Sequence, residues 1–590
     1  MERTTSPTAV TPSSSSAPSL SASGGAAFDL DFLVATTGGT VVHRRDPSVA
    51  AAGPEPHADR AASRRPADAY TGVSIDGRNV PLGGVWFAIR GERLDGHQFI
   101  GQAAARGAAA LVVVRGRAQH LPPLDATVIE VDEGIAAVCA LAAAHRLRFP
   151  SLRVVAVAGS HGKTTVRDML AASLGAHASA SAVLKSDGRH QTPLTLALTL
   201  LELRATHRYA VLEMGTTRPG DITRLAALAR PDVGVVVSLG VEHLQTFGGL
   251  AEVARAEAEI FAALPAAGVA VYPFGDELLA PWAEASPAVR RIRFGRAPES
   301  AVRVLAAHVL PDGTAVTLRL PDGSLCESRL SLVGLHNAQN AAAAAAAAYA
   351  LGLPAATITA GLPEARSSKQ RSALIDVAGR HILDDCYNAS PPTVIAALDT
   401  LADFARQSGS RSIAVLGDVL ELGPSEAALH RAIGAHAAHL HLDLLVAVGR
   451  LGASIAEGAR AAGLADDHVI HVDEVDDAAW HASKRAKPGD WVLLKASRGA
   501  RLEKIVEQLR EAFAPPPPPP PRPVPPPAPT LFRGTPAASQ QKGGPVVTYK
   551  RPGAPSYGGG QGPRSGPRPG GGGGGGGRGR PFFNPRKPRS

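Results

Sequence analysis

Residues 154–165 have the sequence Val-Val-Ala-Val-Ala-Gly-Ser-His-Gly-Lys-Thr-Thr. The first five are small or β-branched apolar residues without polar alternation, which is typical of a buried strand in a parallel sheet. Gly159 and Gly162 then allow a tight turn whose backbone amides point inward, and such a turn holds phosphate. Lys163 adds a positive charge for the outer phosphates, and Thr164 offers a hydroxyl to Mg²⁺. The stretch predicts a nucleotide-phosphate loop between a strand and a helix.

The helix expected from about Thr165 aims its positive dipole end at the same anion. The eight-residue form of this loop has a glycine where this chain has Val157, so the loop is a shortened variant. A plain strand-to-helix turn with an exposed lysine is the alternative. The order of glycine, lysine and threonine directly after a strand pattern favours the phosphate loop.

The chain has 590 residues and 45% hydrophobic content, enough for several domains with their own cores. Its three cysteines (Cys139, Cys326 and Cys386) share no metal-ligand spacing, and so sparse and odd a set indicates a reducing compartment. We therefore expect a cytoplasmic protein. The N-terminus lacks the pattern of a signal peptide, and no run of about 18 apolar residues predicts a membrane span.

The net charge of +9 is concentrated in a tail. Residues 515–590 contain twelve Lys or Arg and no Asp or Glu, which leaves 49 basic and 52 acidic residues elsewhere. We therefore expect no nucleic acid partner for the folded body. Seven prolines from Pro515 and eight glycines at 570–577 predict a stiff spacer followed by a flexible coil. The scattered arginines could bind an anionic polymer, although a solvated appendage is the simpler interpretation.

Alternating strand and helix patterns predict an α/β protein of three folded domains. The expected divisions are a disordered segment at 1–26, a small α/β domain at 27–148, and a central parallel-sheet domain at 149–362. A second doubly wound domain is expected at 363–513, and a disordered tail rich in Pro, Gly and Arg at 514–590.

Two polar residues follow predicted strands of the central domain. Glu213 stands near the end of the strand at 209–214, and His243 follows the strand at 232–239. Ligands of open parallel sheets bind outside the carboxyl ends of the strands, so both fall where metal and phosphate would lie. A lone Glu or His is more often structural, but two at equivalent strand ends beside a phosphate loop favour Mg²⁺ coordination.

Two predicted helices of the central domain carry further polar residues. The helix at 250–264 carries Glu257, which would ordinarily belong to a solvated charged face. Asn337 and Asn340 stand three residues apart at the start of an alanine-rich helix and share one face. That face suits contact with the edge of a base, although helix capping is the simpler role.

The motifs of the chain, in order, occupy residues 74–78, 91–97, 159–165, 213–215 with 219–220, 240–243, 259–261, 336–337 with 340, 384–391, 416–418 with 420–423, and 495–503. As an ordered set across roughly residues 28–513 they resemble the Mur ligase family. The strings Asp-Asp-Cys-Tyr-Asn-Ala at 384–389 and Leu-Gly-Asp-Val-Leu-Glu-Leu-Gly at 416–423 are similar to those of its D-alanyl-D-alanine-adding branch.

The resemblance implies a three-domain Mur ligase architecture: a small N-terminal domain that holds the UDP-sugar, a central ATPase domain, and a C-terminal Rossmann-like domain that brings the amine. It implies an ATP-dependent amide ligase that adds D-alanyl-D-alanine to UDP-N-acetylmuramoyl-tripeptide through an acyl phosphate, in peptidoglycan precursor synthesis. ATP and Mg²⁺ are the implied cofactors, and a monomer is expected.

The resemblance also implies roles for individual residues. The catalytic residues would be Lys163, His243 and Glu257. Mg²⁺ would be held by Thr164, Glu213, His243 and Glu257. The ATP-binding residues would be Gly159, Ser160, His161, Gly162, Lys163, Thr164, Thr165, Asn337, Asn340, Arg371 and Asp385. The substrate-binding residues would be Ser74, Asp76, Arg78, Asp95, Gly96, His97, Asn388, Ser390 and Pro391.

The chain departs from the family at three positions. Glu257 stands where the family has a lysine whose carbamylated side chain holds the second Mg²⁺, and our hypothesis is that the glutamate replaces the carbamate. Residues 185–188, Lys-Ser-Asp-Gly, replace an Asn-rich segment, and His161 is common in a sister ligase. A paralogous ligase with another amine acceptor and a degraded homologue acting as a scaffold are the alternatives. The intact set of Lys163, Thr164, Glu213 and His243 argues against the scaffold.

Overall fold

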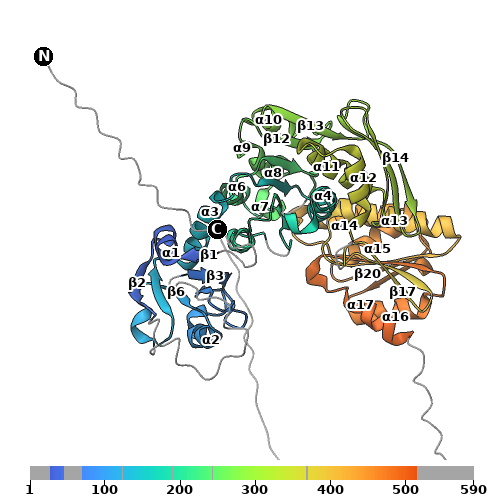
Figure 1. Ribbon diagram of the computed structural model, residues 1–590. Helices are drawn as coiled ribbons and strands as arrows, with labels where there is room; N and C mark the ends of the chain where they lie inside the picture. Colours follow the sequence, from blue (N-terminus) through green and yellow to red (C-terminus); the bar gives the residue numbers. More distant parts are fainter. Residues whose placement is uncertain are drawn as a thin grey trace, which may run out of the picture. The chain divides into compact units, whose positions relative to one another are not determined.

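A computed structural model describes most of the chain between residues 27 and 513 (Figure 1). The expected disordered segments at 1–26 and 514–590 lie outside the described residues. The described ranges are 27–45, 69–121, 124–188, 191–241, 244–366 and 370–513.

The N-terminal part contains a five-stranded sheet in the order β2-β7-β6-β5-β4, in which only β2 runs antiparallel to its neighbour. β1 and β3 form a separate antiparallel pair. β6 and β7 form because two runs of apolar residues bury almost all of their side chains. The elements are β1 (Ala27–Asp29), α1 (Leu30–Thr37), β2 (Thr40–His43), β3 (Ala69–Thr71), β4 (Val73–Ser74), β5 (Val85–Phe87), α2 (Ile100–Ala105), β6 (Ala110–Val114), β7 (Thr127–Val131) and α3 (Gly134–Leu147).

The central part is a nine-stranded sheet in the order β16-β15-β14-β13-β12-β11-β8-β10-β9. Strands from β9 to β14 pair in parallel, and β14, β15 and β16 continue the sheet as an antiparallel meander. Its strands are β8 (Arg153–Ala158), β9 (Val183–Lys185), β10 (Tyr209–Glu213), β11 (Val233–Val236), β12 (Val269–Pro273), β13 (Arg290–Gly295), β14 (Val302–Leu310), β15 (Gly313–Arg319) and β16 (Leu325–Leu330). Its helices are α4 (Lys163–His177), α5 (Pro193–Leu200), α6 (Asp221–Ala229), α7 (Leu244–Phe247), α8 (Leu250–Glu257), α9 (Glu259–Ala262), α10 (Ala280–Glu284), α11 (His336–Ala350) and α12 (Ala355–Gly361).

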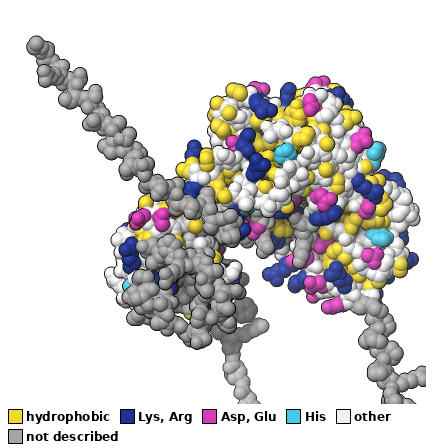
Figure 2. Space-filling model, viewed as in Figure 1, with side chains coloured by type: hydrophobic (Ala, Val, Ile, Leu, Met, Phe, Trp, Pro, Cys, Tyr) yellow, Lys and Arg dark blue, Asp and Glu magenta, His cyan; other side chains and the backbone are white. Residues whose placement is uncertain are grey.

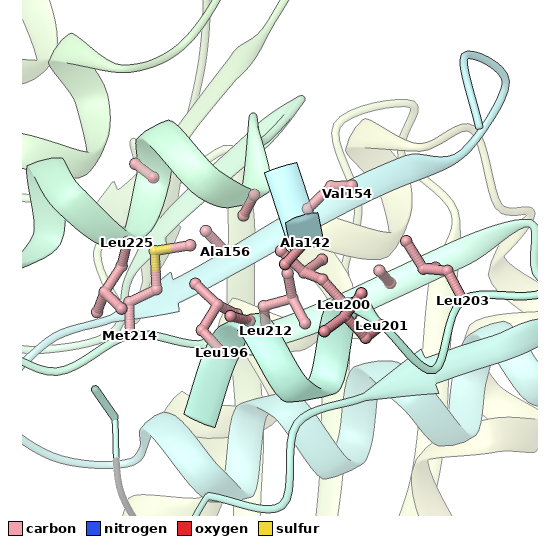
Figure 3. Packing of buried hydrophobic residues seen from close by; sticks show 14 of the residues in the cluster. Ala142, Val154, Ala156, Leu196, Leu200, Leu201, Leu203, Leu212, Met214 and Leu225 are labelled. Atoms are coloured by element: carbon pink, nitrogen blue, oxygen red, sulfur yellow. The ribbon is translucent and has the colours of Figure 1, made fainter. Parts of the chain in front are cut away.

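Helices cover both faces of this sheet because successive residues of its strands point to opposite sides. Val154 and Ala156 of β8 join a core shared with α3, α5 and α6 (Figure 3). Val155 and Val157 face the other way, into a core shared with α4, α11 and α12. The alanine run of α11 is buried throughout, so this helix packs closely against the sheet without large side chains.

The C-terminal part is a six-stranded sheet in the order β17-β18-β22-β19-β20-β21, parallel except for β17 at its edge. α13, α14 and α15 pack on one face, and α16 and α17 on the other. The strands are β17 (Ala373–Val377), β18 (Arg380–Asp384), β19 (Ser412–Leu416), β20 (Leu444–Val448), β21 (Val469–Val472) and β22 (Trp491–Lys495). The helices are α13 (Pro391–Ser408), α14 (Glu426–His439), α15 (Gly452–Ala461), α16 (Val475–Arg485) and α17 (Lys504–Ala512).

The expected three-domain α/β fold is confirmed, with two local differences. The helix after the phosphate loop begins at Lys163 rather than near Thr165, because Gly162 in the left-handed region ends the turn there. The helix expected at 250–264 is interrupted at Ala258, which separates α8 from α9. Beyond the interruption, the Glu259 carboxylate accepts a 2.6 Å hydrogen bond from Gly220 N at the start of α6.

The surface of the folded part carries both signs of charge. Figure 2 shows Lys or Arg and Asp or Glu side chains interspersed on the viewed face. Among the helices of the described residues, none has the length and apolar character that crossing a membrane requires.

Gly434 tests how closely α14 and α15 pack. A Cβ at this position would overlap the carbonyl oxygen of Ile455 and lie 2.8 Å from Ala459 N. We expect Gly434→Ala to lower the free energy of unfolding by ~1–3 kcal/mol, because backbone on both helices must move. Urea unfolding followed by circular dichroism measures the change.

Gly101→Ala is the matched control. Gly101 lies exposed in α2, and nothing lies within 4 Å of the added Cβ. The free energy of unfolding of the Gly101→Ala variant should rise by about 0.5–1 kcal/mol, since alanine favours the helix more than glycine does. Equal effects of both substitutions would contradict the packing argument.

His145 predicts a dependence of stability on pH. Its ring is fully buried on α3, between Phe28 at 5.3 Å and Phe149 at 5.0 Å between ring centroids, and Nε2 lies 3.2 Å from Leu203 O. Burial lowers the pKa of His145 from 6.5 to about 4. The unfolded chain therefore binds a proton that the folded chain does not, so stability present above pH 6.5 is lost as the pH falls toward 4.

The loss attributable to His145 should reach ~3 kcal/mol at pH 4. His145→Gln should flatten the plot of unfolding free energy against pH between 6.5 and 4, even if its stability at pH 7 is lower. A slope unchanged by this substitution would show that other groups account for acid sensitivity.

Candidate functional site

The phosphate loop lies between β8 and α4, and its two glycines are required by space and by backbone angle. Gly159 has φ of 120° and Gly162 has φ of 81°, values that favour glycine. A Cβ on Gly159 would lie 2.8 Å from Val237 N, and one on Gly162 would overlap the Asn340 side-chain oxygen. The loop is therefore pressed between the end of β11 and α11, and it leads directly into the N-terminus of α4.

The loop's own groups bond to one another in this structure. Lys163 Nζ donates to Gly159 O at 2.5 Å and to Ser160 O at 3.3 Å, so its side chain folds back over the loop. Ser160 Oγ donates to Gly240 O at 3.2 Å and anchors the loop to the segment after β11. The amides expected to point inward are already engaged: Gly159 N donates to Glu257, Ser160 N to Ser238 O and His161 N to Ser238 Oγ. The Lys163 ammonium and the N-terminus of α4 are the groups that favour an anion here.

The register of the central sheet brings Glu213 to the loop. Glu213 pairs with Val157 across β10 and β8, two residues before Gly159. Thr164 Oγ1 consequently donates to Glu213 Oε2 at 2.9 Å, and both residues are buried. Two members of the predicted metal set thus lie in direct contact.

The donor set of this site fits Mg²⁺. A hydroxyl and a carboxylate oxygen are hard ligands, and Mg²⁺ usually takes one or two carboxylates with nucleotide phosphates and water completing its octahedron. Within the described part of the chain, no three His, Cys, Asp or Glu side chains cluster so as to hold a metal by themselves. His243 lies outside the described residues, so its predicted role as a ligand stays a prediction.

Glu257 reaches the same loop from α8. Its side chain is fully buried, and Oε2 accepts a 2.6 Å hydrogen bond from Gly159 N. A second predicted metal-binding carboxylate therefore contacts the first glycine of the loop. Whether it also reaches a metal ion stays a prediction.

His161 connects the loop with the C-terminal part. Its Nε2 lies 3.2 Å from the hydroxyl of Ser390, which caps α13 together with Thr393. Burial, reinforced by the charges of Lys163 and Lys495, lowers the pKa of His161 to about 3. The ring is therefore neutral at physiological pH.

Asn337 and Asn340 bond to each other and to the chain. Asn337 Nδ2 donates to Val333 O at 2.7 Å, and Asn340 Nδ2 donates to Asn337 Oδ1 at 3.0 Å. Asn337 does not cap α11, because the N-cap residue is Leu335 and has no side-chain capping bond; its amide group instead ties the first turn to Val333. Contact with adenine stays a prediction.

The predicted residues of the C-terminal part have partners that the sequence did not indicate. The Asp385 carboxylate accepts a 2.6 Å hydrogen bond from the buried Lys495 and one of 2.9 Å from Ser372 N. The Arg371 guanidinium lies over the Tyr387 ring, 4.0 Å from its centroid. The sequence signal for Lys495 was a lysine as the last residue of the otherwise apolar run Trp491–Lys495, which forms β22.

The first predicted substrate-binding motif of the N-terminal part forms a local turn. Ser74 Oγ donates to Asn79 O at 2.8 Å, and Arg78 forms a two-point ion pair with Asp76. The pair holds the pKa of Asp76 below its usual value and leaves the Arg78 side chain largely exposed.

The second motif is built around His97. Its Nδ1 donates to Asp95 at 2.6 Å and its Nε2 accepts from Val114 N at 3.0 Å, so both ring nitrogens are engaged. Gly96 leaves no space for a side chain, because a Cβ there would lie 2.6 Å from Ile89 O. Asn388 is exposed, whereas Pro391 is buried as the first residue of α13.

Two polar residues missed by the sequence contact Glu213. Arg167 Nη1 lies 3.3 Å from Glu213 Oε2, and Gln191 Nε2 donates to Glu213 Oε1 at 2.5 Å. Arg167 stands three residues after Thr164 and therefore shares its face of α4. This spacing was the sequence's indication that Arg167 could reach the same site as Thr164.

Comparison with known proteins gives matches along nearly all of the described chain. The model for "Mur ligase family, catalytic domain" matches residues 69–146, that for "Mur ligase middle domain" 157–348, and that for "Mur ligase, glutamate ligase domain" 370–498. The UDP-N-acetylmuramoyl-tripeptide--D-alanyl-D-alanine ligase of Bacillus subtilis is 35% identical over 442 residues, which cover 75% of this chain and 93% of that protein. The enzyme of the same name from Escherichia coli is 34% identical, with 74% and 93% covered.

Solved structures share the fold. The crystal structure of MurF from Acinetobacter baumannii aligns with a TM-score of 0.70 at 28% identity and covers 82% of this chain and 99% of its own. The MurF ligase of Thermotoga maritima in complex with ADP aligns with a TM-score of 0.64 at 26% identity, with 75% and 97% covered. The matched domains, the relatives spanned over nearly their whole length and the common fold show that this chain belongs to the Mur ligase family.

Proposed function

We propose that this protein is an ATP-dependent amide ligase that joins D-alanyl-D-alanine to UDP-N-acetylmuramoyl-tripeptide in peptidoglycan precursor synthesis. The observation that carries the proposal is the 2.9 Å contact between Thr164 and Glu213 at the glycine loop, in a member of the Mur ligase family. Relatives that are 34–35% identical bear the name of this activity, which supports the choice of substrates. The ADP bound by the relative from Thermotoga maritima supports ATP as the nucleotide.

A carboxylate is a poor electrophile, so the tripeptide must be activated before an amine can attack it. In the proposed first step a carboxylate oxygen of the tripeptide attacks the terminal phosphorus of ATP, ADP leaves and an acyl phosphate forms. The amine nitrogen of D-alanyl-D-alanine then attacks the acyl carbon. The amide bond forms as inorganic phosphate leaves and the amine loses its proton.

Groups of the glycine loop would stabilise the charge that builds on the transferring phosphoryl group. Lys163 would leave Gly159 O for a phosphate oxygen, and the N-terminus of α4 would act on the same anion. The loop backbone is held by packing against β11 and α11, whereas Lys163 must exchange its bond to Gly159 O for one to the nucleotide.

Thr164 and Glu213 would hold Mg²⁺, with Glu257 and His243 as further proposed ligands. When bound, the metal ion supplies positive charge close to the phosphoryl oxygens. The Glu257 carboxylate would serve where the family has a carbamylated lysine.

The remaining assignments belong to the same proposal. Residues 27–148 would bind the UDP-sugar, residues 149–362 ATP, and residues 363–513 the amine. Asn337, Asn340, Arg371 and Asp385 would contact ATP, while the motifs at 74–78 and 95–97 and residues Asn388, Ser390 and Pro391 would contact the other substrates. A monomer in the cytoplasm is proposed, and the tail at 514–590 is proposed as a solvated appendage that activity does not need.

Phosphate release from ATP tests the function. We expect rapid release only when UDP-N-acetylmuramoyl-tripeptide, D-alanyl-D-alanine, ATP and Mg²⁺ are all present. Release should fall to background when the peptide or the dipeptide is omitted, and Lys163→Ala should abolish it because the loop loses its phosphate-binding cation.

Other outcomes separate the alternatives. Phosphate release with the nucleotide-sugar tripeptide and a different amine, but not with D-alanyl-D-alanine, would identify a paralogous ligase. The unusual segment at 185–188 is the feature that favours this alternative. The absence of release and of ATP binding under all conditions would identify a scaffold and refute the proposal.

Glu257→Gln tests the replacement of the carbamate. The amide retains the shape of the side chain but loses the charge that would hold a metal ion, so turnover should fall about 100-fold or more. Steady-state phosphate release at saturating ATP and Mg²⁺ measures the effect.

Glu252→Gln is the matched control for this substitution. Glu252 lies exposed on the same helix, α8, and its substitution should leave turnover unchanged. An unchanged rate in Glu257→Gln would mean that the Glu257 carboxylate does no more than bond to Gly159.

A further inference from the structure

Arg167 is a buried cation of α4 that the proposed reaction does not use. Only 4% of its side chain is exposed, and a buried guanidinium is stable only when it is paired. It has two partners: Asp168 Oδ1 at 2.8 Å from Nη2, and Glu213 Oε2 at 3.3 Å from Nη1. One partner is thus the carboxylate that lies against Thr164.

These contacts form part of a chain of alternating charges. Lys185, whose side chain is about half exposed, lies 3.0 Å from Asp168 Oδ1. The order from the surface inward is therefore Lys185, Asp168, Arg167 and Glu213, which we call the Glu213 charge chain. At its inner end, Gln191 Nε2 donates to the remaining Glu213 oxygen.

The unusual segment at 185–188 encloses the charge chain. Ser186 Oγ accepts a 2.9 Å hydrogen bond from Glu213 N. A Cβ on Gly188 would overlap Arg167 Nη1 and lie 2.8 Å from Glu213 Oε2, so only glycine allows the backbone to cover the ion pair. Ser186, Gly188, Gln191 and Glu213 line part of a small recess beside the carboxylate, with room for about one water-sized particle.

Arg167 and a metal ion would compete for one oxygen. Glu213 Oε2 accepts from both Thr164 Oγ1 and Arg167 Nη1, and a cation held by the Thr164 and Glu213 oxygens would lie close to the guanidinium. Like charges at such a distance repel strongly in a buried site. The phosphates of a nucleotide add several negative charges at the loop, which offset that repulsion.

We propose that Arg167, by occupying Glu213 Oε2, makes binding of the divalent cation at this site depend on the nucleotide. This inference rests on the proposed function only in taking ATP as the ligand of the loop. Asp168 keeps Arg167 paired when Glu213 turns to the metal ion. The nucleotide-free site is thus neutralised by the protein itself.

Binding of Mn²⁺ to the full-length protein, measured by electron paramagnetic resonance, tests the inference. Affinity is determined with Mn²⁺ alone and with Mn²⁺ plus a non-hydrolysable ATP analogue. In the unaltered protein, the analogue should raise the affinity for Mn²⁺. Arg167→Gln should bind Mn²⁺ alone about tenfold more tightly and should lose most of this coupling.

Three further variants isolate the charge of Arg167. Arg167→Lys should restore weak binding of Mn²⁺ alone, because it keeps the cation. Asp168→Asn should weaken binding of Mn²⁺ alone, since Arg167 is then left to Glu213, and a shift opposite to that of Arg167→Gln cannot come from general loss of stability. Arg224→Gln removes an exposed arginine of α6 that pairs with Asp221, and should change nothing.

The inference is overturned if Arg167→Gln binds Mn²⁺ alone no more tightly than the unaltered protein, with the coupling intact. Should Arg167→Gln fail to fold, Asp168→Asn decides: unchanged or tighter binding of Mn²⁺ alone contradicts the inference. Failure of ATP as the ligand of the loop, the one part of the proposed function used here, has a different signature, because the unaltered protein would then bind neither the analogue nor Mn²⁺ in its presence.

Discussion

The parallel pairing of β8 with β10 on one side and with β11 on the other is the constraint on which the site depends. Its register sets Val157 beside Glu213 and Ala158 beside Val236. The loop that follows β8 must therefore emerge between a carboxylate and the backbone after β11. The glycines at its two bends, the start of α4 at Lys163 and the contact of Thr164 with Glu213 all follow from that placement.

The site is built to bind anions, yet two carboxylates lie within it. Glu257 bonds to the amide of Gly159, and Glu213 bonds to the hydroxyl of Thr164. The cationic groups around them, Lys163 and Arg167, also bond to protein acceptors. Groups that would meet nucleotide and metal ion are thus already satisfied within the chain, so ligand binding exchanges one set of partners for another rather than filling unmet bonds.

The sequence predicted a large part of the fold because its signals are local. Apolar runs marked β6, β8, β10 and β20, and glycine with lysine and threonine marked the loop. It failed to foresee the interruption of the helix at Ala258, where the chain bends before Glu259 contacts the N-terminus of α6. Apolar spacing continues through Ala258, so periodicity gave no sign of the bend.

The sequence by itself determined which chemical groups are present and on which elements they stand, since hydrophobic spacing, glycine and capping residues act over a few neighbouring positions. The tertiary structure alone decided which of those groups meet. Glu257 contacts Gly159 from 98 positions away, and Lys495 contacts Asp385 from 110. Arg167 is an ordinary polar residue of a helix until the sheet brings Glu213 to it. Such contacts depend on strand order and register, and no short stretch of sequence records them.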